Sequence, residues 1–164
     1  MLYPQSVAAV ATTDSAPKVT DPDFDVAAAR RSDQAAARSQ AREPVDHVVD
    51  LVVDGVPVRY YRPVAEPEGL VVHLHGGGFV FNDIEVHDAS VRRLANRSQL
   101  AVLSVEYRRP PEHRFPAAPD DVSTVVGWLD RDGLATLGLP KTTPLFSHGD
   151  SAGGNLARET LVGT

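Results

Sequence analysis

The sequence predicts an α/β fold built on a mostly parallel sheet that helices cover on both faces. Three observations predict it: a hairpin signal comes first, short apolar strands then alternate with helical segments, and two of those strands run into glycine-rich turns. Strands that alternate with helices are typical of parallel sheets, because each parallel pair needs a crossover connection. The 164 residues, 42% of them hydrophobic, suffice for one domain with a buried core.

Composition argues against several classes of function. The net charge of −6 argues against nucleic-acid binding, which requires a concentrated basic surface, and the 16 Lys and Arg residues are scattered. Cysteine is absent, which excludes disulfides and thiolate metal sites. No apolar run approaches the roughly 20 residues of a membrane helix, and the start lacks the basic region of a signal peptide. We therefore expect no membrane span and, by default, a cytoplasmic location.

The N-terminal part divides into two segments. Residues 1–19 are small, polar and aperiodic, and we expect a flexible arm there. Residues 20–44 form a helical region rich in alanine. Thr20 or Asp21 is expected to cap this helix, and Pro44 lies just beyond its end.

The remainder, residues 45–164, carries the predicted sheet. Asp54-Gly55 separates two runs of β-branched residues, which predicts a hairpin over 48–61. The two short apolar runs at 70–74 and 100–107 are typical of strands buried on both faces. Segment 108–119 holds four prolines and is expected to be irregular. The other expected elements are helices over 86–98, 120–137 and from 152 onward, and a strand over 145–148.

The first motif is Gly149-Asp150-Ser151-Ala152-Gly153, which matches G-x-S-x-G between the last strand and the last helix. In such an elbow the serine sits on a sharp turn, and the two glycines let the backbone pass closely. The turn exposes the Ser151 hydroxyl as a nucleophile and aims the Ala152 amide at a developing oxyanion. Asp150 fills the free position and is interpreted as structural rather than as a triad acid.

The second motif is His75-Gly76-Gly77-Gly78, which follows the strand at 70–74. Glycines remove side chains, so backbone amides can converge on one oxygen. Gly77 and Gly78 are the expected donors, Gly76 is a weaker candidate, and His75 is expected to orient the loop. A phosphate-binding loop is disfavoured, because the Gly-Lys-Ser/Thr ending is missing.

A metal site is not expected. His73 and His75 point to the same side of a strand, but no third ligand lies near them in the sequence.

With both motifs in this order, the chain resembles the hormone-sensitive-lipase-like family of bacterial esterases. Segment 107–112 looks like the family's YR-x-x-PE stretch, residues 115–118 read FPAA, and residues 149–155 read GDSAGGN. The resemblance runs from about residue 20 to the end. It implies a doubly wound α/β-hydrolase fold, a cap formed by the N-terminal helix, and hydrolysis of short or medium acyl esters without a cofactor.

The sequence departs from this family where the rest of the triad is expected. The family's order is Ser, then Asp or Glu, then His, yet all six histidines precede Ser151 and Glu159 is the only acid after it. We therefore expect a fold truncated after the nucleophile elbow, without triad acid or histidine, that is weakly active or inactive. The alternative is a non-catalytic interaction or ligand-binding module. A nucleotide-binding domain is disfavoured, and no oligomeric state is indicated.

Overall fold

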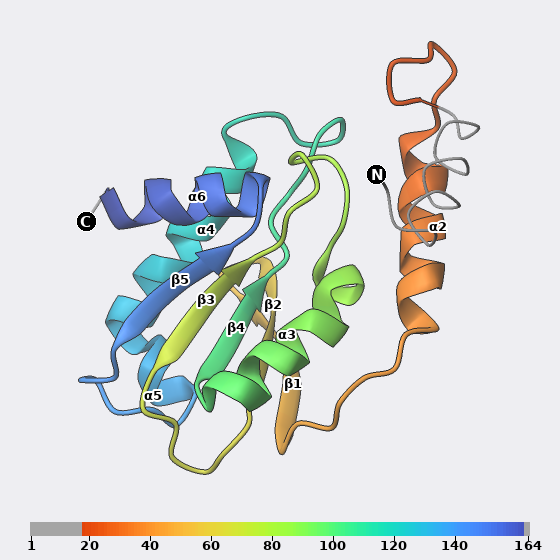
Figure 1. Cartoon of the computed structure of the whole chain (residues 1–164). Helices are drawn as coiled ribbons and strands as arrows, with labels where there is room; N and C mark the ends of the chain where they lie inside the picture. The colour runs from red at the N-terminus through yellow and green to blue at the C-terminus, as the bar shows by residue number, and fades with distance from the viewer. Residues whose placement is uncertain (1–17, 163–164) are drawn as a thin grey trace, which may run out of the picture.

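The computed structural model describes residues 18–162, so nearly all of the arm expected over 1–19 lies outside the described residues. Figure 1 shows the helices and strands in their arrangement. The helices are α2 (Val26–Arg38), α3 (Ile84–Ser98), α4 (Ala117–Trp128), α5 (Leu134–Thr136) and α6 (Ala152–Val162), and a π-helical turn, η1, spans Leu129–Gly133. The strands are β1 (His47–Val53), β2 (Val56–Arg62), β3 (Leu70–Leu74), β4 (Ala101–Val105) and β5 (Leu145–Gly149).

The five strands form one mixed sheet in the order β1-β2-β4-β3-β5. The expected hairpin is confirmed, with β1 and β2 antiparallel around Asp54-Gly55. Strands β4, β3 and β5 run parallel, as the alternation with helices predicts, whereas β2 is antiparallel to β4. The parallel half therefore carries both glycine-rich turns at the carboxyl ends of its strands.

The core lies on both faces of β3 and β4, because successive side chains on a strand alternate between faces. Leu70, Val72 and Leu74 face α4 and α6, in one cluster with Val122 and Leu156. Val71 lies in the second cluster, with residues of β2, β4 and α3. Helix α3 covers one face of the sheet and α4 and α6 cover the other (Figure 1). Helices on both faces confirm the layering that the sequence predicts.

A buried carboxylate joins three segments beneath α3. The Asp88 side chain is fully buried and accepts hydrogen bonds from Tyr61 Oη at 2.7 Å, Arg92 Nε at 2.7 Å and Arg59 Nη1 at 3.0 Å. Arg42 Nη1 lies 3.2 Å away and brings in the chain before β1. Burial opposes ionisation, but these donors outweigh it and hold the pKa of Asp88 below its usual value.

Two helices differ from the expectation. Helix α2 begins at Val26 with Asp25 as its N-cap, not with Thr20 or Asp21, because the Asp25 side chain accepts the Ala28 amide. The single helix expected over 120–137 is instead α4, the π-helical turn and α5. A side chain at Gly133 would lie 2.6 Å from the Trp128 ring, so glycine allows that ring to pack where the helix widens.

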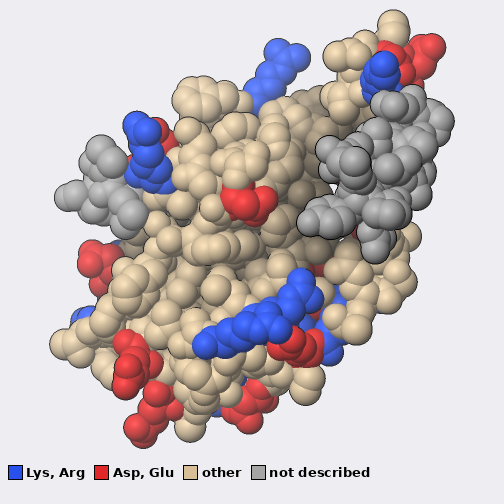
Figure 2. Space-filling model, viewed as in Figure 1, with Lys and Arg blue, Asp and Glu red and all other residues tan. Residues whose placement is uncertain are grey.

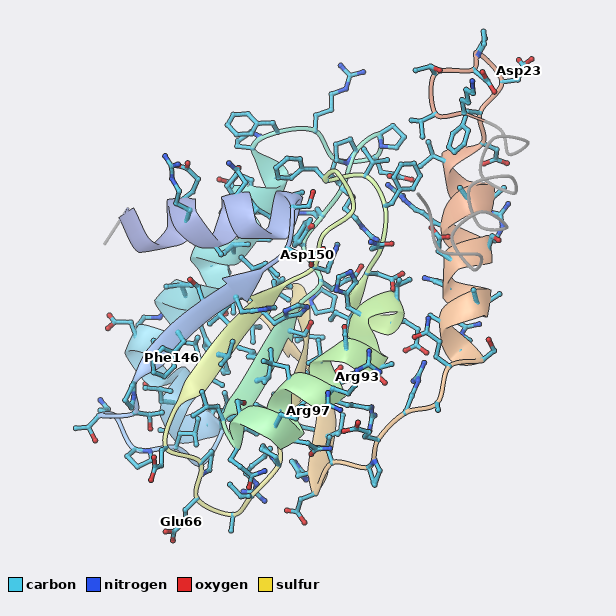
Figure 3. All side chains as sticks on the ribbon, viewed as in Figure 1. Asp23, Glu66, Arg93, Arg97, Phe146 and Asp150 are labelled. Carbon is cyan, nitrogen blue, oxygen red and sulfur yellow. The ribbon has the colours of Figure 1, made fainter. Side chains whose placement is uncertain are left out.

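Strand β5 lies at an edge of the sheet. Within residues 18–162 it pairs only with β3, and Leu145 and Phe146 are 41% and 49% exposed. Figure 3 places Phe146 at this open edge. Pro144 precedes the strand, a position at which proline is tolerated, and its carbonyl accepts the Leu70 amide at 2.9 Å. Among the described helices, none has the length and apolar character needed to cross a membrane.

Candidate active site

Ser151 lies in the turn between the end of β5 and the start of α6, as G-x-S-x-G predicts. Its φ of 51° is in the left-handed region, which is strained for a residue other than glycine. A Cβ on Gly153 would lie 2.7 Å from the His75 carbonyl oxygen, and a Cβ on Gly149 would lie 2.7 Å from that of Leu74. Both positions therefore need glycine, because the elbow packs directly on the end of β3.

The glycine loop after β3 is also strained. Gly77, Gly78 and Phe79 have φ values of 119°, 59° and 64°, and positive φ is unusual for a bulky residue such as Phe79. The Gly77 carbonyl closes the loop by accepting the Val80 amide at 3.0 Å and the Phe81 amide at 2.8 Å. Strain of this kind clusters at functional sites, where the surrounding structure holds it in place.

Asp150 joins the two turns. Its Oδ1 accepts the Gly76 amide at 3.2 Å, and a Cβ on Gly76 would lie 2.9 Å from the Asp150 carboxyl carbon. Figure 3 shows Asp150 beyond the end of β5, beside the loop that follows β3. Asp150 thus links the two turns, and this contact engages the Gly76 amide.

Three amides of the two turns have no acceptor among the described protein groups. Within residues 18–162, neither Gly77 nor Gly78 donates its amide to a protein acceptor, and the same is true of Ala152 at the first position of α6. Helix N-termini carry unpaired amides and favour negative charge. Each of the two turns joined by the contact between Gly76 and Asp150 therefore contributes at least one backbone amide without a protein acceptor.

The His75 side chain contacts both Tyr107 and the backbone of the glycine loop. Its ring stacks on Tyr107 with 4.1 Å between centroids, and its Nδ1 donates to the Gly76 carbonyl at 2.9 Å. Tyr107 Oη in turn donates to the His75 carbonyl at 2.6 Å. Burial lowers the pKa of His75 to about 4, so the ring is neutral at pH 7. These contacts fit the orienting role predicted for His75.

No described histidine contacts the Ser151 hydroxyl. His148 and His73 pair through their Nδ1 atoms at 3.1 Å, and burial lowers the pKa of His73 to about 3. His87 Nδ1 lies 3.9 Å from Asp150 Oδ1, and burial lowers the pKa of His87 as well. Throughout the described residues, no three His, Asp or Glu side chains form a metal-binding group.

Two hollows adjoin this region. One, of about 640 Å³, opens beside the glycine loop, and its walls include Phe79, Val80, Pro110, Phe115 and Leu156. These mostly apolar walls bring together α6 and the proline-rich segment. Parts of both lie in the stretches that carry the family resemblance, but the sequence did not predict that they would line a common hollow.

The second hollow, of about 470 Å³, lies between α3 and β5 over His73 and His148. Arg93 and Arg97 line it, and Figure 2 shows the basic strip that these two side chains form over α3.

Comparison with known proteins decides the family. The profile of a family described as alpha/beta hydrolase fold matches residues 71–163, which include both glycine-rich turns. The chain belongs to the α/β-hydrolase-fold family. This assignment confirms the fold class and the resemblance to hormone-sensitive-lipase-like esterases that the motifs indicate.

Individual relatives of this α/β-hydrolase-fold chain include enzymes and a receptor. An arylesterase of Saccharolobus solfataricus is 36% identical over 77% of this chain and 42% of its own length. The gibberellin receptor GID1 of Oryza sativa is 33% identical over 71% of this chain and 40% of its own length. The solved structure of a hyperthermophilic esterase from Pyrobaculum calidifontis superimposes with a TM-score of 0.87 at 36% identity, covering 98% of this chain and 53% of that one. The chain thus spans about half the length of these relatives or less.

Proposed function

We propose that this protein is a carboxylic ester hydrolase of the serine type. The observation that carries the proposal is that the strained Ser151 turn contacts the glycine loop, while among the described residues the amides of Gly77, Gly78 and Ala152 have no protein acceptor. Preorganised amides of this kind stabilise the negative charge that develops when a serine attacks an ester carbonyl. The named esterases among the relatives support the same activity.

In this reaction the Ser151 oxygen attacks the ester carbonyl carbon, and the carbonyl oxygen takes up negative charge. Gly77, Gly78 and Ala152 donate to that oxyanion, the alcohol leaves, and an acyl-enzyme remains for water to hydrolyse. Both steps need a base, since a serine hydroxyl is a weak nucleophile on its own. No described histidine is hydrogen-bonded to Ser151, and His73, His75 and His148 have other partners, so we propose that residues 1–164 alone turn over weakly or not at all.

The substrate class follows from the hollow beside the glycine loop. Its volume of about 640 Å³ and its walls of Phe79, Pro110 and Leu156 suit an apolar group of modest size. We propose small neutral esters with short or medium acyl chains. We further propose that the protein binds no nucleic acid, needs no cofactor and is cytoplasmic. These proposals rest on the acidic net charge and on the sequence motifs.

The test is acylation of Ser151 rather than turnover. The 164-residue chain is incubated with p-nitrophenyl butyrate, and intact-mass and peptide mass spectrometry locate the butyryl group. We expect slow addition of one butyryl group at Ser151, because deacylation needs the same missing base, with turnover barely above background. Ser151→Ala is expected to abolish the label, and Ser90→Ala, a hydroxyl on α3 outside the elbow, to retain it. A folded chain that is never acylated at Ser151 would refute the proposal.

A ligand-binding module is the second candidate. The observation that favours it is the similarity to the gibberellin receptor of rice, together with an apolar hollow that does not depend on a base. In this case small apolar ligands bind the folded chain with the same affinity in the wild type and in Ser151→Ala, and no acyl group is transferred. The acylation experiment therefore separates the two functions.

A further inference from the structure

Helix α2 lies along the segment that continues the glycine loop. The Phe24 ring, just before the helix, meets the Phe81 ring edge-on with 6.1 Å between centroids. Within the helix, Gln34 Nε2 donates to Asp83 Oδ2 at 2.5 Å. Between these two contacts lies Arg30, whose side chain is only 15% exposed. Residues 24–34 thus contact the segment that continues the glycine loop at three points along the helix axis.

Arg30 binds three separate acceptors with one guanidinium group. Its Nε donates to the Val80 carbonyl at 2.8 Å, and its Nη2 donates to the Pro110 carbonyl at 2.5 Å. Its Nη1 donates to both carboxylate oxygens of Glu112 at 2.9 Å. The planar fork of arginine carries five donors on three nitrogens and can reach acceptors that lie well apart, whereas lysine has three donors on a single nitrogen.

Two of these acceptors belong to the candidate site. Val80 and Pro110 both line the apolar hollow, on opposite segments of the chain. The Val80 amide also donates to the Gly77 carbonyl, so a constraint on Val80 acts on the strained turn that contains Gly77 and Gly78. The guanidinium therefore sets the distance between the glycine loop and the proline-rich segment.

We propose that Arg30 is a positioning residue, which fixes the glycine loop against the proline-rich segment and so preorganises the oxyanion-binding amides and the wall of the hollow. The ion pair with Glu112 is half exposed, and such pairs stabilise a fold little. The carbonyl contacts, by contrast, are directional and link segments 50 and 80 residues away in the sequence. The catalytic consequence of this proposal rests on the proposed ester hydrolysis, whereas the positioning itself does not.

Hydrogen–deuterium exchange of the 164-residue chain tests the positioning directly. Arg30→Gln removes the fork, and Arg30→Lys keeps the charge without the fork. Arg31→Gln is the matched control, since the Arg31 side chain is 69% exposed and its one ion-pair contact, with Asp25, is 3.9 Å long. We expect amide exchange over 77–82 and 112–113 to accelerate about tenfold in both Arg30 variants, because charge-assisted hydrogen bonds are lost. Strands β3 and β4 and the Arg31→Gln control are expected to exchange as in the wild type.

A second measurement separates positioning from general support of the fold. Ethyl butyrate is titrated into each variant while the Gly77 and Gly78 amides are followed by NMR. The titrations are made at a temperature well below unfolding. If Arg30 is a positioning residue, Arg30→Gln binds ethyl butyrate several-fold more weakly than the wild type, whereas Arg31→Gln binds it with unchanged affinity. If Arg30→Gln unfolds, Glu112→Gln removes a single acceptor and is expected to give a smaller acceleration over the same segments.

The outcomes are distinguishable. A lower melting temperature with unchanged exchange over 77–82 and unchanged ethyl butyrate binding would overturn the proposal, because Arg30 would then be a structural residue only. Absence of ethyl butyrate binding in the wild type counts against the proposed function, while the exchange data still decide whether Arg30 holds the loop.

Discussion

Replacement of Gly153 by alanine tests the packing that places Ser151. A Cβ at this position would lie 2.7 Å from both the Leu74 carbonyl carbon and the His75 carbonyl oxygen, whereas real Cβ contacts essentially never fall below 3.0 Å. The clash is with backbone at the end of β3, a fully buried strand, so it cannot be relieved by a side-chain rotation. Either α6 or the start of the glycine loop must move.

The expected cost follows from the rigidity of that backbone. Overpacking a tight site typically costs 1–3 kcal/mol, and contact with two backbone groups places Gly153→Ala at the upper end, about 3 kcal/mol. Gly154→Ala is the matched control in the same helix. Its Cβ would lie 3.1 Å from the Gly149 carbonyl, and the gain of about 1 kcal/mol in helix propensity offsets that tight contact.

The assay is urea and thermal unfolding of the two variants, followed by Trp128 fluorescence and near-UV circular dichroism. We expect Gly154→Ala to unfold close to the wild type. A difference of about 3 kcal/mol corresponds to a melting temperature about 6–12 °C lower for Gly153→Ala. Equal stability of the two variants would show that the elbow does not press on β3 as the structure indicates.

Three further predictions concern charge, pH and the sheet edge. Asp88→Asn is expected to lower the free energy of unfolding by about 3–5 kcal/mol in urea titrations, since it removes a fully buried carboxylate from three partly buried arginine side chains; a loss below 1 kcal/mol would contradict this. Because the pKa values of His73 and His75 are depressed in the folded state, the unfolded chain binds protons that the folded chain does not as pH falls below about 6.5. The free energy of unfolding should therefore decline by up to about 1.4 kcal/mol per pH unit for each group between about pH 6.5 and 4. Unfolding experiments at pH 7, 6 and 5 measure this decline. A free energy of unfolding that did not change with pH would show that the rings are not buried and neutral. Phe146→Lys is expected to reduce self-association of the 164-residue chain in sedimentation experiments without altering its circular dichroism, because a lysine protects an exposed strand edge; unchanged association would indicate that another surface is responsible.

The elbow and the glycine loop were predictable because their signals are local. The spacing of glycines around Ser151 and after His75 indicates directly where the backbone must turn sharply and pack closely against neighbouring backbone. The hairpin at Asp54-Gly55 is of the same kind. In each case the residues that dictate the conformation lie within a few positions of one another.

The features that sequence reasoning missed depend on distant partners. The acceptors of Arg30 lie 50 to 82 residues further along the chain, and nothing in an alanine-rich helix distinguishes Arg30 from its neighbour Arg31. The Asp88 cluster likewise combines residues from three segments. The N-cap of α2 is Asp25, and the sequence alone does not indicate which of several nearby acidic residues caps the helix.

The positions of the histidines explain which part of the chemistry the described residues can carry. His73 and His148 pair with each other, and His75 is stacked on Tyr107 with its Nδ1 committed to the glycine loop. Burial keeps His73 and His75 neutral at pH 7, but a general base must also reach the proton that it removes. None of these rings is hydrogen-bonded to Ser151, so under the proposed function these three histidines do not supply the base that acts on the serine. An oxyanion site without a base favours slow acylation over turnover, which is why the labelled serine, and not the rate of hydrolysis, is the informative measurement.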